Sequence, residues 1–289
     1  MSVESSLTQD FLVEIGTEEL PPKSLKKLSD AFSKGIENGL KEAGLNYESA
    51  KSFASPRRLA LRVSGLETKQ ADKIVEKKGP SKKAAFDAEG NPSRALQGFA
   101  KSLKIEPEQL EEQETPKGTW LVYRSTEKGQ STLSLLNAIV DQSLSKLPIS
   151  KRMRWGAQKV EFVRPLQWVL MIFGGKVVPG SILDIPNGNT TRGHRFHSEG
   201  EIIITQANDY EKVLFEQGKV IADYDKRKEK IRLGVQEIAR TEGGSAVIDE
   251  DLLDEVTSLN EWPVPLLGRF EERFLEVPTE ALISSMKEH

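Results

Sequence analysis

The sequence predicts an α+β protein with mixed or antiparallel sheets and packed helices, and not a Rossmann fold. A strand-like apolar run, an amphipathic helix and two further strand-like runs follow one another at the start of the chain. Neither a dinucleotide-binding glycine fingerprint nor a phosphate-binding glycine loop is present. We expect two lobes of this class, at residues 1–150 and 151–289.

The first unit of this kind occupies residues 11 to 63. Residues 11–15 read as a buried strand, and the proline pair that follows suits the first turn of a helix. Apolar residues recur at three and four positions over 25–40, and Gly44 stands where that helix should stop. Residues 51–54 and 58–63 predict two strands joined through a proline.

The chain then becomes polar and charged from Lys69 to Pro116. Residues 77–83 and 87–92 have the composition of loops, and a short helix is expected between Ser93 and Leu103. We interpret the lysine-rich segments at 77–83 and 226–230 as solvated surface.

Strands and helices alternate less regularly in the remainder. We expect strands at 120–123 and 201–204, and a hairpin in which 168–173 turns through two glycines into 176–178. Expected helices begin after Ser131, after a cap at Asp223, around 252–259, and at Pro278 or Thr279. The last of these has no stop signal before His289, so we expect the native chain to continue.

Composition limits the possible functions. The 41 basic and 44 acidic residues nearly cancel, so any contact with RNA requires a local patch of charge. The absence of cysteine excludes disulfides, thiol nucleophiles and thiolate metal sites. Residues 1–10 do not resemble a targeting peptide, and the most apolar run, 168–173, is too short to span a membrane. We expect a cytoplasmic protein.

Cations interleaved with aromatic rings mark the best candidate binding residues. Such a mixture suits RNA, because guanidinium groups bind phosphate oxygens and rings stack on bases. A further basic point is Ser55-Pro-Arg-Arg58, where strand alternation should turn one arginine to solvent. The candidates for RNA contact or for a subunit interface are Arg57, Arg58, Arg154, Trp155, Arg164, Arg192, His194 and Arg195.

A structural role for the same residues is an open alternative. Trp155 and Phe196 can serve as core anchors while the arginines pair with carboxylates, among which Glu14, Glu18 and Glu19 lie near the first strand.

His194 and His197 suggest a third possibility, a metal-dependent hydrolase. Imidazole and carboxylate groups are the ligands that a cysteine-free site needs. On an extended segment, however, an odd separation directs the two rings to opposite faces. We therefore expect no metal site, and we find no complete catalytic constellation in the sequence.

Eight blocks of sequence resemble, in the same order, the beta subunit of bacterial glycyl-tRNA synthetase. They are Phe11-Leu-Val-Glu-Ile-Gly-Thr-Glu-Glu-Leu-Pro-Pro22, Ser55-Pro-Arg-Arg-Leu-Ala-Leu61, Met153-Arg-Trp-Gly156, Phe162-Val-Arg-Pro165, Arg192-Gly-His-Arg-Phe196, Lys219-Val-Ile-Ala-Asp-Tyr224 with Arg227, Glu261-Trp-Pro263 and Phe274-Leu-Glu-Val-Pro278.

The resemblance implies the N-terminal portion of one subunit of a class II glycine-tRNA ligase with two alpha and two beta subunits. In that family ATP, Mg²⁺ and glycine are handled by the alpha subunit, and the beta subunit assists recognition of tRNA(Gly). The implied partners are therefore the alpha subunit, a second beta subunit and tRNA(Gly), with no membrane and no cofactor bound by this chain. The family's beta subunit extends beyond residue 289 through an HD-type domain and an anticodon-binding region.

Overall fold

The structure, a computed structural model, describes residues 7–87, 90–116, 118–156 and 159–287. The chain separates into two compact units: a larger unit, which ends at Thr68 and resumes at Thr132, and an inserted unit over Lys69–Ser131. The lobes predicted at 1–150 and 151–289 do not correspond to these units, because strands from both predicted lobes pair in one sheet.

Some sequence-based predictions fall partly on residues outside the described ranges. These are the absence of a targeting segment at 1–10, the loop at 87–92, the segment from Arg154 to Arg164 that holds three of the candidate binding residues, and the end of the last helix.

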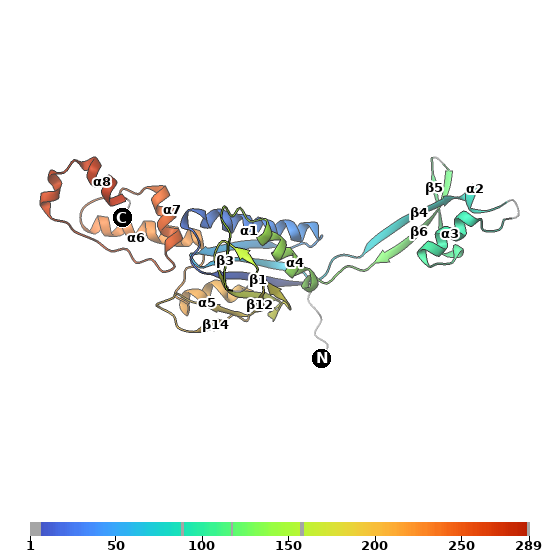
Figure 1. Cartoon of the computed structure of the whole chain (residues 1–289), viewed down its shortest axis with the longest axis horizontal. Coiled ribbons are helices and arrows are strands. Elements are labelled where there is room, and N and C mark those ends of the chain that lie inside the picture. Colours follow the sequence, from blue (N-terminus) through green and yellow to red (C-terminus); the bar gives the residue numbers. More distant parts are fainter. Residues whose placement is uncertain (1–6, 88–89, 117, 157–158, 288–289) are drawn as a thin grey trace. The chain divides into compact units, whose positions relative to one another are not determined.

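A seven-stranded mixed sheet forms the centre of the larger unit (Figure 1). β12 runs parallel to β9, while the other neighbours in the sheet are antiparallel. The predicted α+β class is confirmed. The order of the main path is β11 (Ser181–Ile182), β12 (Ile185–Gly188), β9 (Leu166–Phe173), β1 (Thr8–Thr17), β3 (Arg58–Glu67) and β2 (Ser49–Ser55), and β10 (Lys176–Val177) pairs with β9 beside this path.

Both faces of this sheet are covered, so β1 is buried from Phe11 to Thr17. Phe11, Val13 and Ile15 pack with α1 and α4, and Leu12 faces α5 and β14 on the opposite side (Figure 1). The elements around the sheet are α1 (Pro22–Glu42), α4 (Thr132–Ser145), β7 (Met153–Arg154), β8 (Glu161–Phe162), β13 (Thr190–Arg192), β14 (Glu201–Ile203), η2 (Ala207–Asp209), α5 (Tyr210–Glu216), α6 (Tyr224–Thr241), α7 (Glu250–Leu259), η3 (Glu272–Glu276) and α8 (Thr279–Lys287).

A buried arginine ties α6 and α7 to the sheet. The fully buried guanidinium of Arg227 donates hydrogen bonds to the carbonyl oxygens of Ala54 (2.8 Å), Ile221 (2.5 Å) and Thr257 (3.0 Å). Burial lowers the pKa of Arg227 to about 10, so the group remains charged at neutral pH. The charge is therefore solvated by backbone carbonyl dipoles.

The inserted unit is a three-stranded antiparallel sheet with short helices. β6 (Gly118–Glu127) lies between β4 (Lys73–Ser81) and β5 (Glu111–Thr115). Ser93 caps α3 (Arg94–Leu103), because its hydroxyl accepts a hydrogen bond from the Leu96 amide. The other elements are α2 (Lys82–Ala85) and η1 (Pro107–Gln109), and Ala85, Leu96 and Leu121 form the unit's small core.

Most predicted elements of the larger unit are confirmed, and the main error lies in the inserted unit. The predicted stripe of α1 is buried, and Asp223 caps α6 by accepting a hydrogen bond from the Lys226 amide. The loop predicted at 77–83 is wrong, because residues 77–81 continue β4 and 82–85 form α2. No helix in the described part of the chain is long and apolar enough to cross a membrane.

Removing the inserted unit should leave the larger unit folded. The Thr132 amide donates a hydrogen bond to the Thr68 carbonyl at 3.0 Å, so a short glycine-serine linker can replace residues 69–131. We expect urea unfolding that remains cooperative, with a melting temperature within a few degrees of the intact chain, as measured by circular dichroism. A deletion of 49–67, which removes β2 and β3, serves as the control that should not fold. Loss of cooperativity after replacement of 69–131 would contradict the prediction.

Candidate functional site

A row of side chains crosses the sheet where β1 leads into α1. The register places Ser55 of β2, Arg58 of β3, Gly16 of β1 and Trp168 of β9 opposite one another in turn. Gly16 leaves the space that the indole of Trp168 fills, because a Cβ at residue 16 would lie 2.0 Å from Cε2 of Trp168. The guanidinium carbon of Arg58 lies 5.8 Å from the centroid of the same ring.

Glu14 lies on the same face of β1, two residues before Gly16, and is completely buried. Its carboxylate accepts hydrogen bonds from the indole of Trp168, the hydroxyl of Thr191 and the phenol of Tyr210, and Arg58 lies 3.5 Å away. Burial and the adjacent Glu14 raise the pKa of Tyr210 well above its usual value, so the phenol remains a donor. The buried carboxylate is therefore fully hydrogen-bonded.

Glu261 supplies the second carboxylate of this network from the segment after α7. It accepts hydrogen bonds from the Ser55 hydroxyl at 2.7 Å and from Arg58 at 3.1 Å. Burial opposes ionisation of Glu261, but the charge of Arg58 and the hydrogen bond from Ser55 outweigh it and lower its pKa. The same two carboxylates raise the pKa of Arg58, although burial acts in the opposite direction. Arg58 is thus a permanent buried cation between Glu14 and Glu261.

Arg57 is buried beside this network but does not join it. Its side chain is 9% exposed, its Nε atom has no acceptor, and no hydrogen bond or ion pair involves its guanidinium among the described residues. The guanidinium carbon lies 5.6 Å from the ring centroid of Trp168. Burial lowers the pKa of Arg57, and the nearby charge of Arg195 acts in the same direction, against the attraction of Glu261.

Arg57 sits in a tight turn, which explains why the strand-alternation prediction is wrong. Pro56 and Arg57 form the two-residue turn between β2 and β3, and the Arg57 carbonyl accepts a hydrogen bond from the Thr17 amide at 2.8 Å. This contact folds the turn onto the β1–α1 connection. Arg57 and Arg58 are both buried, whereas one of them was expected to face solvent.

Three more arginines lie around the β1–α1 connection and, with Arg57, form what we call the arginine rim. Arg195 pairs with Glu18 at 2.8 Å and with Glu19 at 3.5 Å. Arg164 donates to the backbone carbonyl of Glu19, and Arg192 lies 3.9 Å from its nearest carboxylate and 5.6 Å from the ring centroid of Trp168. Of the four arginines Arg57, Arg164, Arg192 and Arg195, therefore, only the last has a carboxylate within 3.5 Å in the described structure.

The segment from Arg192 to Ser198 turns sharply and presents its side chains beside the rim. Gly193 permits this turn, because a Cβ there would lie 2.4 Å from the Ser198 hydroxyl. The rings of His194 and His197 stack at a centroid distance of 4.3 Å, and Phe196 is 83% exposed. Burial lowers the pKa of His194, so its imidazole is neutral at pH 7.

The structure brings six of the eight predicted site residues together. Arg57, Arg58, Arg164, Arg192, His194 and Arg195 surround Trp168 and the β1–α1 connection. Arg154 and Trp155 do not join them: Arg154 pairs with Glu161 on the β7–β8 hairpin, and Trp155 packs on the core at the opposite face of the sheet.

Sequence reasoning missed the groups that hold the site together. Trp168, Thr191 and Tyr210 come from three elements, and each contacts Glu14. Local sequence gives little sign of this convergence, except for an acidic residue and a glycine on one face of an otherwise apolar strand.

The two histidines do not form a metal site with neighbouring acids. No group of three or more histidine, cysteine, aspartate or glutamate side chains in the described ranges is arranged to hold a metal ion. The prediction that the two rings face opposite ways is wrong, because the Ser198 amide bonds to the His194 carbonyl and closes a turn.

Replacing Gly16 by alanine should strongly destabilise the larger unit. The added methyl group overlaps the Trp168 indole, so the ring must move and lose its hydrogen bond to Glu14. We expect a loss of roughly 1–3 kcal/mol in the free energy of unfolding, measured with urea. Gly188→Ala is the matched control, because its nearest neighbour would be 3.7 Å away. Equal effects of the two substitutions would disprove the packing argument.

Glu261→Gln should destabilise the protein at neutral pH by roughly 3–5 kcal/mol, because Arg58 loses a buried counter-ion. The folded pKa of Glu261 is below its unfolded value of 4.5, so its ionic contribution is complete above about pH 4.5 and is lost as the pH falls through the folded pKa. The difference between the variant and the natural chain should therefore shrink in acid, as measured by urea unfolding from pH 7 to pH 3.

Glu250→Gln provides the surface comparison. Hydrogen bonds from Arg232 and Lys228 lower the pKa of Glu250 to about 2, but its side chain is 58% exposed. Solvent screening should make its effect much smaller than that of Glu261→Gln. A pH-independent difference between Glu261→Gln and the natural chain would show that the carboxylate charge is not what stabilises Arg58.

Comparison with known proteins gives a consistent result. A family model described as glycyl-tRNA synthetase beta subunit matches residues 11–289. The chain is 62% identical to the glycine–tRNA ligase beta subunit of Marinobacter nauticus over 98% of its own length, and 56% identical to that of Hahella chejuensis over 96%. It spans 41% and 40% of the lengths of these two relatives. The match to residues 11–289 establishes that the chain belongs to the glycyl-tRNA synthetase beta subunit family.

Proposed function

We propose that this chain acts within the beta subunit of a glycine–tRNA ligase and contacts tRNA(Gly) through the arginine rim. In this proposal the chemistry with ATP, Mg²⁺ and glycine takes place on the alpha subunit, and two alpha and two beta subunits assemble in the cytoplasm. The family and the names of the relatives support this assignment.

The proposed RNA contact rests on one observation, the lack of an acceptor for the side chain of Arg57 among the described residues. The Nε atom of Arg57 is buried without an acceptor, which costs free energy, and the terminal donors, which have no partner among the described residues, match the oxygens of a phosphate group. Arg58, the adjacent residue, has two carboxylate partners and is fully buried, so its role is internal. In this proposal Arg57 binds the RNA, whereas Arg58 has a structural role.

The surroundings of Arg57 suit a nucleic acid. Among the residues that the structure describes, Arg192 has no carboxylate closer than 3.9 Å, and Arg164 donates only to backbone carbonyls. Phe196 presents an exposed ring on which a base can stack. Since the whole chain has a formal charge of only −3, binding depends on this local group of incompletely neutralised arginines.

The contacts of Arg195 favour a second candidate, a structural interaction module. Arg195 joins the turn after β13 to the β1–α1 connection through Glu18 and Glu19. All three side chains are more than 40% exposed, and exposed ion pairs contribute about 0–1 kcal/mol. A structural role for Arg195 therefore predicts only a small change in melting temperature.

Arg57→Gln and Arg192→Gln should weaken the binding of tRNA(Gly) by about tenfold each, because each removes a charged donor to phosphate. The slope of log affinity against log salt concentration should become shallower by roughly one unit for each lost contact. Fluorescence anisotropy with labelled tRNA(Gly) at several salt concentrations measures both quantities.

Arg154→Gln is the matched control for Arg192→Gln, because both arginines are exposed and lie within 4 Å of a glutamate, but Arg154 lies on the separate β7–β8 hairpin. Its tRNA affinity and salt slope should be unchanged. Normal tRNA binding by both rim variants, together with a lowered melting temperature, would favour the structural module instead.

A further inference from the structure

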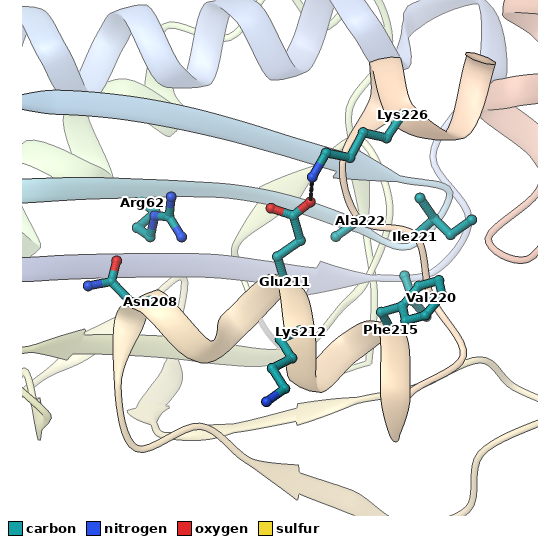
Figure 2. Close-up of a pocket in the computed structure, with 9 residues that line it drawn as sticks. All are labelled: Arg62, Asn208, Glu211, Lys212, Phe215, Val220, Ile221, Ala222 and Lys226. Atoms are coloured by element: carbon teal, nitrogen blue, oxygen red, sulfur yellow. Dashed lines mark hydrogen bonds and ion pairs between the residues drawn. The ribbon is translucent and has the colours of Figure 1, made fainter. Parts of the chain in front are cut away.

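A pocket on the same face of the sheet as the arginine rim is lined by residues of β3, α5 and the start of α6 (Figure 2). Its volume is about 510 Å³, within the roughly 300–1,000 Å³ of small-molecule sites. The described residues that line it are Arg62, Asn208, Glu211, Lys212, Phe215, Val220, Ile221, Ala222 and Lys226.

The charges in this pocket are predominantly positive. The Nε atom of Arg62 is buried without an acceptor, and neither Arg62 nor Lys212 has an ion-pair partner among the described residues. Glu211 is the carboxylate of the lining, and it is already paired with Lys226 at 2.5 Å (Figure 2) and with Lys51 at 2.9 Å. Burial opposes ionisation of Glu211, but these two lysines lower its pKa and keep it charged. The pocket therefore contains two cations, Arg62 and Lys212, that are not neutralised by a described carboxylate and can bind an anion.

The pocket also has a flat apolar wall. Phe215 is 48% exposed although it lines the pocket together with Val220 and Ile221. Its ring centroid lies 5.1 Å from that of Trp262, which in turn has the ammonium of Lys230 at 4.9 Å. A half-exposed aromatic ring and cations without an ion-pair partner line the same pocket, so the pocket can accept a ligand that is both planar and anionic.

We infer that this pocket binds one unpaired nucleotide of RNA, with the base against Phe215 and the phosphate near Arg62 and Lys212. The charges would also attract an acidic peptide, but carboxylates alone leave the exposed ring without a partner, whereas every base has a face for stacking. The lysine-rich start of α6, which composition alone assigns to solvated surface, supplies Lys226 to this pocket. The inference rests on the proposed contact with tRNA but concerns a second place on the chain.

Phe215→Leu tests the stacking directly, because it keeps an apolar side chain and removes the aromatic face. Titration of the 289-residue chain with tRNA(Gly) and with a single-stranded oligouridylate should show affinities roughly 5- to 150-fold lower than for the unaltered chain. Phe215→Tyr keeps the ring and should bind both RNAs normally. The melting temperature of Phe215→Leu, measured alongside, should stay close to that of the unaltered chain because the side chain is half exposed.

Lys212→Gln tests the charge, with Lys27→Gln on α1, at the opposite face of the sheet, as its matched control. The first variant should make the salt slope for the oligouridylate shallower by about 0.7, and the second should not change it. Competition by a glutamate-rich peptide of equal charge should be weak, since such a peptide has no planar group to place on Phe215.

The outcomes distinguish this inference from the proposed function. Normal RNA binding by Phe215→Leu together with weak binding by Arg192→Gln would overturn the nucleotide pocket and leave the tRNA contact standing. Binding of the oligouridylate that depends on Phe215, without any binding of tRNA(Gly), would support the pocket and overturn the tRNA contact. Equal competition by the acidic peptide, or no binding of either RNA, would overturn the pocket.

Discussion

The arrangement of the larger unit depends on one buried cation, the guanidinium of Arg58. It contacts Ser55 in the neighbouring strand, the carboxylates of Glu14 and Glu261, and the backbone carbonyl of Arg192. Burying such a charge is costly unless its donors are satisfied, and these four partners come from four separate stretches of the chain. The strand at 190–192 and the segment after α7 are thereby fixed against the central sheet. Mispairing at any one of them leaves a charge without a partner.

The same burial gives the neighbouring Arg57 its character. Since Arg58 takes both buried carboxylates by direct contact, Arg57 is left with the ring of Trp168 and the more distant charge of Glu261. The Trp168 indole can occupy its place only because residue 16 is glycine. Two adjacent arginines at one tight turn therefore differ in their contacts. Arg58, the first residue after the turn, is paired with two carboxylates, whereas Arg57, within the turn, keeps a donor without an acceptor.

The sequence predicts the local elements well because periodicity and caps are local signals. The stripe of α1, the capping aspartate of α6 and the glycine hairpin after β9 all follow from residues a few positions apart. The predicted lobes at 1–150 and 151–289 do not match the two units, because the units are defined by contacts between residues that are far apart in the sequence. The inserted unit at Lys69–Ser131 can be recognised only when β1 is known to pair with β9, which joins residues about 150 positions apart.

The candidate site can also be predicted only as far as local sequence allows. The basic blocks containing Arg57, Arg192 and Arg195 are visible in the sequence, and the structure brings them together. Which arginine is internal and which retains free donors depends on Glu261, more than 200 positions from Arg58. No pattern within either block carries that information.

The position of Arg62 on β3 links the rim to the second pocket. Arg58 and Arg62 are four residues apart on one strand, so both point to the same face of the sheet, and Arg57 precedes them in the turn. At about 3.3 Å per residue, Arg57 and Arg62 are roughly 16 Å apart along the strand. Both guanidiniums lack an acceptor at Nε, while Arg58 between them is neutralised. Under the proposed function, a single RNA segment reaches both positions, so two guanidinium groups without a carboxylate partner among the described residues can contribute to binding by a chain with almost balanced charge.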